Sequence, residues 1–196
     1  MIERHPNTRG VLYLVVCAAP PAQQVQEFVI LAQAAPWDVC VIATPQARHF
    51  IDQPLLEKLT GYPVRSEYKT IGTPDVLPKM DAMAVAPMTL NTLTKLADGH
   101  ADTLALSQLC KGLGLRLPLI VAPCITAAFA HHPAFSRSVA VLQECGVHVL
   151  YDTESFPAPK IVPWKVILDE LNEMYTRHNI SEKADRTVQA SGETPW

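Results

Sequence analysis

The sequence has neither a GxGxxG nor a GxxxxGK[ST] pattern, so it offers no dinucleotide fingerprint and no P-loop. Its longest apolar run, 11–19, is well short of the roughly 18 to 20 residues that cross a bilayer. Lysine and arginine total 16 against 19 acidic residues, and they form no basic stripe. These absences argue against a membrane span, nucleic-acid binding and the common nucleoside-triphosphate enzymes.

The cysteines form no CxxC pair and are scattered along the chain at positions Cys17, Cys40, Cys110, Cys124 and Cys145. An odd, dispersed set of this kind predicts no disulfide framework and no metal site. We therefore expect a protein of the reducing cytoplasm. The first apolar run is interpreted as an opening strand rather than a secretory leader, because further strand-like and helix-like segments follow it directly.

Near-continuous apolar runs alternate with segments of helical periodicity. Strands are expected at 10–18, 38–44, 82–87, 118–124 and 146–152, and helices at 21–34, 45–60, 90–98, 102–114, 134–145 and 164–178. This alternation predicts an α/β fold, a Rossmann-like three-layer sandwich with a mainly parallel sheet and helices on both faces. Residues 1–9 are expected to be an N-terminal extension, 10–180 a single domain, and 181–196 a polar, disordered tail.

Ligands of such sheets bind at the carboxyl ends of the strands. The Thr44 hydroxyl and the N–H groups that follow it are suited to a phosphate, although Thr44 is equally suited to capping a helix. After the third predicted strand, Thr89, Asn91 and Thr92 bring polar groups that suit a planar ring, with helix capping again the alternative.

Two segments resemble the homo-oligomeric flavin-containing cysteine decarboxylases, the family of phosphopantothenoylcysteine decarboxylase and the lantibiotic peptidyl-cysteine decarboxylases. VIATPQARHFI is similar to the family's TxxAxxF segment. DAMAVAPMTLNTLTKLADGHADTLAL is similar to PASANTxxKxAxGxxDNLL, and the shared residues are Pro87, Asn91, Thr92, Lys95, Gly99 and Asp102. The resemblance covers about residues 10 to 150.

The resemblance implies a domain that binds FMN in homo-oligomers, usually trimers, with the flavin at a subunit interface. Thr44 and Phe50 would contact the phosphate end and the ring region, and Asp102 would fix the loop beside the ring. That loop would contain Pro87, Met88, Thr89 and Asn91. The implied cofactor contacts also include Ala18 and Thr92, and the implied substrate contacts are Asn91 and Cys124.

The chain departs from the family pattern at the places that serve decarboxylation. The family's catalytic histidine would fall at or near Thr73, and no histidine occurs between His49 and His100. The family's PxMNxxMW signature is replaced by PCITAAFAHHP, with Cys124 and Ile125 read at the Met-Asn pair and Ala128-Phe129 at the Met-Trp pair.

Three functions stay open at this point. The first is an FMN-binding flavoprotein that has diverged from the decarboxylases and whose reaction is unknown. The second is oxidative decarboxylation of a cysteinyl peptide or small thiol, with His131 or His132 as a substitute base, although adjacent histidines before a proline also suit an exposed loop. The third is a non-catalytic regulatory or assembly flavoprotein. Cys124 is either a reactive thiol or an inert, buried one.

Overall fold

The computed structural model describes residues 3–70, 72–74, 76–151 and 162–191, with the backbone alone for 182 and 184–191. Within these residues, five parallel strands form one sheet in the order β2-β1-β3-β4-β5. The strands are β1 (Gly10–Val16), β2 (Trp37–Ala43), β3 (Ala82–Met88), β4 (Leu119–Pro123) and β5 (His148–Val149). All five lie inside the runs expected to form strands, or within one residue of them.

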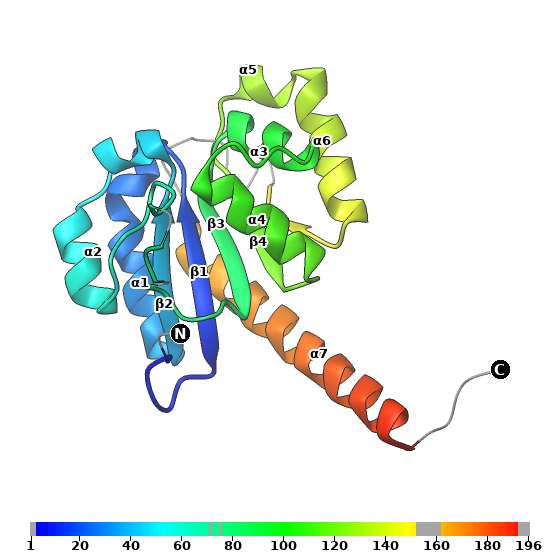
Figure 1. Ribbon diagram of the computed structural model, residues 1–196. Helices are drawn as coiled ribbons and strands as arrows, with labels where there is room; N and C mark the ends of the chain where they lie inside the picture. Colours follow the sequence, from blue (N-terminus) through cyan, green and yellow to red (C-terminus); the bar gives the residue numbers. More distant parts are fainter. Residues whose placement is uncertain (1–2, 71, 75, 152–161, 192–196) are drawn as a thin grey trace.

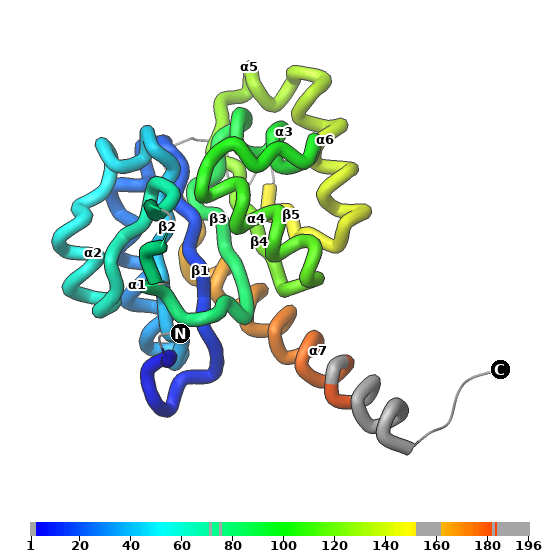
Figure 2. The backbone as a smooth tube through the Cα atoms, in the orientation of Figure 1, coloured from blue at the N-terminus to red at the C-terminus, as the bar shows by residue number. Residues whose placement is uncertain are grey.

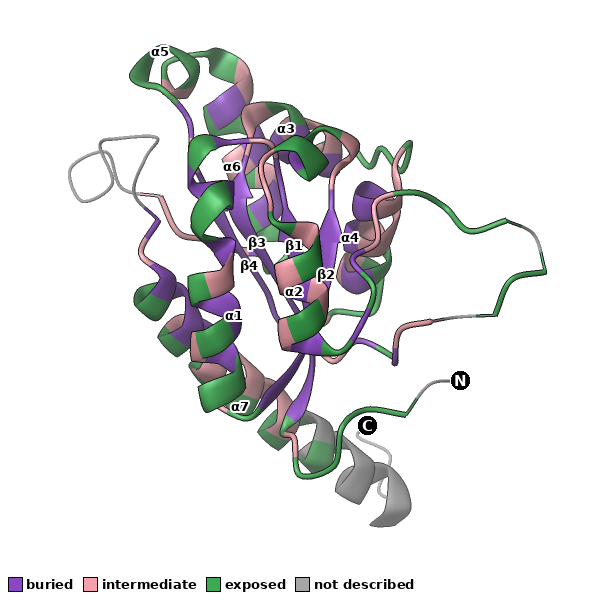
Figure 3. Cartoon of the chain, turned by 90° about the vertical axis from the view of Figure 1, so that its left-hand side faces the viewer, coloured by how far each residue is buried: buried purple, intermediate pink, exposed green. Residues whose placement is uncertain are grey.

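Alternate residues of each strand face two separate hydrophobic cores, as a pleated strand requires. On β1, Leu12 and Leu14 face one core, while Val11 and Val15 face the other. The first core is covered by α1 (Val25–Ala34) and α7 (Trp164–Ser191), with α2 (Gln53–Thr60) beside them. The second is covered by α3 (Leu90–Ala97), α4 (Leu104–Gly114) and α6 (Pro133–Glu144). Figures 1 and 3 show this layering, with the buried strands between helices that are exposed on their outer sides. The predicted fold class is confirmed.

Three short helices stand at the upper edge of the sheet in Figure 1: η1 (Pro20–Gln24), η2 (Pro45–His49) and α5 (Ala127–Ala130). The helix expected at 45–60 is in fact two helices, η2 and α2. Asp52 explains the break, because its side chain accepts a hydrogen bond from Leu55 N at 3.0 Å and Pro54 lies in the first turn of the new helix. The helix expected at 21–34 is likewise divided, into η1 and α1.

Helix α7 is longer than expected, running from Trp164 to Ser191. Its backbone is therefore helical through 181–191, where the polar composition predicts a disordered tail, and 192–196 lie outside the described residues. The reason is that this segment is rich in good helix formers and has no glycine or proline before Gly192. Trp164 anchors the helix against the first core, with its ring centroid 6.0 Å from that of Phe28. No described helix combines the length and the apolar character that a membrane crossing needs.

Hydrogen bonds from His5 in the N-terminal segment hold that segment against the start of β2. The His5 backbone N–H donates to Asp38 Oδ2 at 2.7 Å, and His5 Nδ1 lies 2.8 Å from Asp38 Oδ1. Tyr62 OH donates to the same carboxylate at 2.8 Å. Asp38, only 2% exposed, is thus a buried carboxylate that is satisfied by three donors.

Candidate functional site

Three backbone hydrogen bonds hold four strand ends side by side at one edge of the sheet. Thr44 N donates to Val16 O at 2.9 Å, Cys17 N to Pro87 O at 3.1 Å and Cys124 N to Met88 O at 2.8 Å. The strand order reverses between β1 and β3, which makes this edge the topological switch point where open α/β sheets bind ligands. Figure 2 shows the chain leaving β1, β2 and β3 along this edge.

Thr44 lies at the end of β2 and precedes η2. Its backbone is extended (φ −63°, ψ 155°), it is half-buried, and its side chain makes no capping bond to the helix that follows. The capping alternative is therefore not realised, and the hydroxyl stays available at the switch point. In the same motif, Ala47 is buried and Phe50 packs, partly buried, against the first core.

The turn after β3 is held by a chain of hydroxyl contacts. Thr89 is the N-cap of α3, and its side chain accepts from Thr92 N at 3.5 Å. The two threonine Oγ1 atoms lie 3.1 Å apart, and Cys17 Sγ donates to Thr92 Oγ1 at 3.4 Å. Of the two roles considered for Thr89, the structure shows the helix cap. Thr92 is buried, with 5% of its surface exposed.

Cys17, which joins the end of β1 to the start of α3, was not predicted to be a site residue. The only sequence signal was its position directly after the first apolar run. Burial raises the pKa of the Cys17 thiol, so it stays protonated and acts as a donor near neutral pH.

The other residues of this loop differ in exposure. Asn91 is exposed on the first turn of α3. The Met88 side chain is fully buried in the second core, so of this residue only the main chain lies at the edge. Asp102 forms an ion pair with Lys95 that joins α3 to the start of α4, and the hydrogen bond from Lys95 lowers the pKa of the Asp102 carboxyl.

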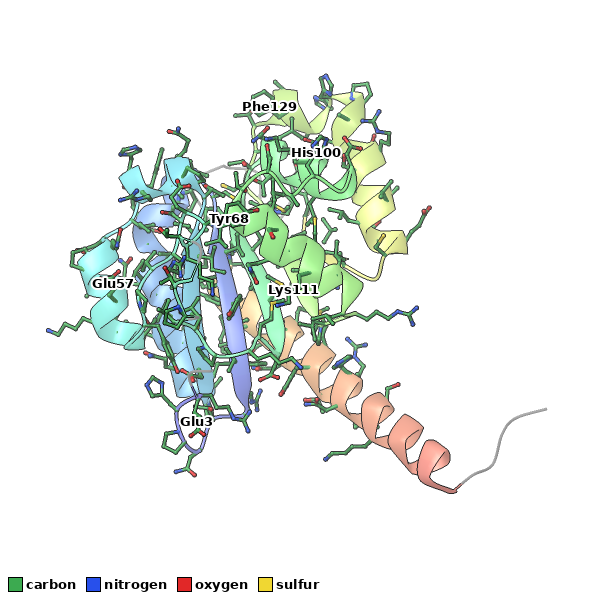
Figure 4. All side chains as sticks on the ribbon, viewed as in Figure 1. Glu3, Glu57, Tyr68, His100, Lys111 and Phe129 are labelled. Atoms are coloured by element: carbon green, nitrogen blue, oxygen red, sulfur yellow. The ribbon has the colours of Figure 1, made fainter. Side chains whose placement is uncertain are left out.

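The turn after β4 carries the altered decarboxylase signature. Counting PxMNxxMW from Pro123 places Ile125 and Thr126 at the Met-Asn positions and Phe129 and Ala130 at the Met-Trp positions. This corrects by one residue the expected assignment to Cys124–Ile125 and Ala128–Phe129. Thr126 is the exposed N-cap residue of α5 and makes no side-chain capping bond. Phe129, labelled in Figure 4 on α5, is 54% exposed.

The candidate catalytic side chains of the sequence analysis lie on or beside this turn. His131 and His132 are both exposed, and His132 is the N-cap of α6, where its Nδ1 accepts from Ala134 N at 3.1 Å. Cys124 is half-buried, and burial raises the pKa of its thiol to about 11. Thr73, at the place of the family's histidine, is an exposed residue of the segment between α2 and β3, where its N–H bonds to Thr70 O.

These features define a Rossmann-like α/β protein with a candidate ligand site at the β1/β3 switch point. The flavoprotein family model matches residues 21–188. Among curated proteins, the probable phosphopantothenoylcysteine decarboxylase of Arabidopsis thaliana is 29% identical over 121 residues, 58% of this chain and 60% of that protein. The Mus musculus phosphopantothenoylcysteine decarboxylase is 33% identical over 116 residues, 56% of each. The chain spans less than two thirds of the length of these curated relatives.

Solved structures share the fold over most of their length. The FMN-dependent cysteine decarboxylase TvaF from thioviridamide biosynthesis superposes with a TM-score of 0.68 at 21% identity, over 86% of this chain and 99% of that one. The cypemycin decarboxylase CypD gives 0.68 at 22% identity, over 90% and 99%. The chain belongs to the flavoprotein family, and the proteins that it resembles include phosphopantothenoylcysteine and cysteine decarboxylases.

Proposed function

We propose that this protein binds FMN at the carboxyl edge of strands β2, β1, β3 and β4 and lacks the decarboxylation machinery of its relatives. The observation that carries the proposal is the half-buried Thr44 beside the switch point, whose hydroxyl does not cap its own helix. Membership of the flavoprotein family and the fold shared with FMN-dependent decarboxylases support the choice of cofactor.

The residues at this edge suit the chemistry of FMN. A phosphate dianion needs hydroxyl and N–H donors, which the Thr44 hydroxyl and the backbone N–H of Ala18 can offer. The N–H groups of Cys17 and Ala19 are already bonded to Pro87 O and Cys17 O. The isoalloxazine ring needs apolar walls with a few directed hydrogen bonds, which the alanine-rich turn after β1 and the exposed Asn91 amide can offer. The FMN itself, when bound, would supply the redox chemistry, and the chain would hold and orient it.

The side chains that decarboxylation needs are replaced at three places. An exposed threonine, Thr73, stands for the histidine, and Ile125 and Thr126 stand for the Met-Asn clamp. A threonine hydroxyl cannot serve as a base near neutral pH. His132 is a poor substitute because its Nδ1 is engaged in capping α6.

A visible absorption spectrum of the purified protein tests the cofactor. We expect a flavin spectrum, with FMN identified chromatographically after heat release, or its restoration when FMN is added to the colourless protein. A colourless protein that fails to bind added FMN at micromolar concentration would overturn the proposal.

Carbon dioxide release from a panel of cysteinyl peptides and small thiols tests the loss of decarboxylation separately. We expect neither release nor flavin reduction. Release of carbon dioxide would support the oxidative decarboxylase function instead. Loss of that release in the His131→Ala, His132→Ala double variant would then show that one of these histidines is the base. A flavin that thiols and reduced nicotinamides both leave oxidised would favour the non-catalytic, regulatory function.

We further propose that the protein works as a homo-oligomer, a trimer or a multiple of it, in a reducing cytoplasm. All five cysteines are free, which suits a reducing compartment. Sedimentation of the flavin-loaded protein tests the assembly, and a monomer at micromolar concentration would contradict it.

A further inference from the structure

A groove with a volume of about 390 Å³ opens on the second face of the sheet, between α4 on one side and residues 65–69 and 76–80 on the other. It shares no lining residue with the strand edge that we assign to FMN. Figure 4 shows two of its lining residues, Tyr68 and Lys111, on the side of the molecule that faces the viewer. The volume lies within the range of small-molecule sites, roughly 300 to 1,000 Å³.

The groove has an apolar floor, and hydrogen bonds hold its walls in place. Tyr13, Ile42 and Met80 form the floor, and all three are buried. Tyr13 OH donates to Pro78 O at 2.9 Å, which fixes one wall to the sheet. The Tyr68 hydroxyl shares its one proton between Ala101 O at 2.9 Å and Thr103 O at 3.1 Å, which joins residue 68 to the residues leading into α4. These bonds hold the groove open in a set shape.

The rim of the groove is cationic. Arg65, Lys69, Lys79 and Lys111 line it, and the described lining residues include no aspartate or glutamate. The whole chain has a net charge of −3, so this concentration of positive charge runs against the average of the molecule. Positive side chains around an apolar, low-dielectric floor attract anions and hold them more strongly than an open surface does.

We propose that this groove is a second ligand site, which binds a small organic anion with an apolar body. The carboxylate or phosphate of the ligand lies against Lys79, Lys111 and Arg65, and its body lies on Tyr13, Ile42 and Met80. No lining residue of this groove is among those that we assign to FMN.

Calorimetric titration of the purified protein, saturated with FMN, provides the test. The probes are octanoate and 1-naphthyl phosphate, one for each anionic group, with 1-octanol and 1-naphthol as their neutral counterparts. We expect at least one anion to bind and both neutral counterparts to bind more weakly. Binding of octanoate alone or of 1-naphthyl phosphate alone would identify which anionic group the site takes.

Matched variants locate the binding. Lys79→Gln with Lys111→Gln should weaken binding of the anion by about three- to thirty-fold, the range for two partly exposed charge pairs. Lys58→Gln with Lys165→Gln removes the same charge from exposed positions elsewhere and should leave it unchanged. Gln108→Trp, on α4, should fill the groove and abolish binding. A circular dichroism spectrum and the FMN content of each variant check that it is folded.

Three results would overturn the proposal. The first is no binding of either anion at millimolar concentration, which is also what a groove covered by a second copy of the chain would give. The second is equal binding by the two paired variants. The third is equal affinity for the anions and their neutral counterparts, since the cationic rim would then give no preference for an anion.

Discussion

Thr44 is the residue on which the proposed cofactor site depends most directly. If its hydroxyl donates to the FMN phosphate, Thr44→Val leaves a buried partner without its hydrogen bond. We expect FMN affinity to fall by about 1 to 3 kcal/mol, roughly 5- to 150-fold. Quenching of flavin fluorescence on titration measures the dissociation constant. Thr176→Val, an equivalent change at an exposed position of α7, is the control.

The same dissociation constant in Thr44→Val and in the wild-type protein would remove Thr44 from the site. The cofactor would then have to depend on the main chain and on the turn after β3.

Cys124 illustrates how burial decides whether a thiol near the site is reactive. With its pKa raised to about 11, only a small fraction is thiolate near neutral pH. We expect iodoacetamide to modify Cys124 slowly at pH 7 and progressively faster up to pH 9, below the range in which the fold is expected to lose stability. Peptide mass spectrometry on a Cys145→Ser background measures this rate without interference from the exposed Cys145. Rapid modification at pH 7 would show an activated thiol and revive Cys124 as a catalytic candidate.

At the scale of elements, α3 and α4 offer a matched pair of helix starts. Thr89 caps α3 and Thr103 caps α4, and each side chain accepts a hydrogen bond from a backbone N–H three residues on. Replacing either threonine by alanine should lower the free energy of unfolding by about 0.5 to 2 kcal/mol. Only Thr89→Ala should also weaken FMN binding, because only α3 begins at the switch point.

Urea denaturation and FMN titration of the two variants separate these effects. An equal loss of FMN affinity in Thr103→Ala would mean that the loss follows general destabilisation rather than the site.

The elements themselves were largely predictable from local sequence. Apolar runs such as 82–87 identify buried strands, and N-caps with nearby prolines mark helix starts. The break between η2 and α2 was not predicted, because an aspartate such as Asp52 can lie on the surface of one continuous helix or cap a new one. Pro54, in the first turn of α2, favours the new helix. The length of α7 was missed because polar composition was read as disorder, although its residues have good helix propensity.

At the scale of the whole molecule, the order of the strands depends on contacts between segments far apart in the sequence. The motifs of the sequence analysis predicted the turns after β2 and β3. The position of β1 between those strands, and with it the contact from Cys17 to Thr92, emerged only from the assembled sheet. The cationic groove was missed for the same reason, since Arg65 and Lys111 come from segments with unrelated patterns.

The buried acids of the second core predict that the fold loses stability in alkali. Burial raises the pKa of Cys17 and Cys40 above 9.0 and that of Tyr62 above 10.0, and the hydrogen bond to Asp38 raises that of Tyr62 further. The folded state therefore holds these protons more tightly than the unfolded chain. This stabilisation is complete below pH 9 and is lost as the pH rises above 9 and then above 10.

Urea denaturation at intervals between neutral pH and about pH 10.5 measures the decline. Tyr62→Phe removes the group whose ordinary pKa is the highest of the three. Its free energy of unfolding should therefore fall less steeply above pH 10 than that of the wild-type protein, even though Asp38 loses a donor at every pH. A free energy of unfolding that stays constant to pH 10.5 would contradict the assignment, because it would mean that these groups ionise as readily in the folded protein as in the unfolded chain.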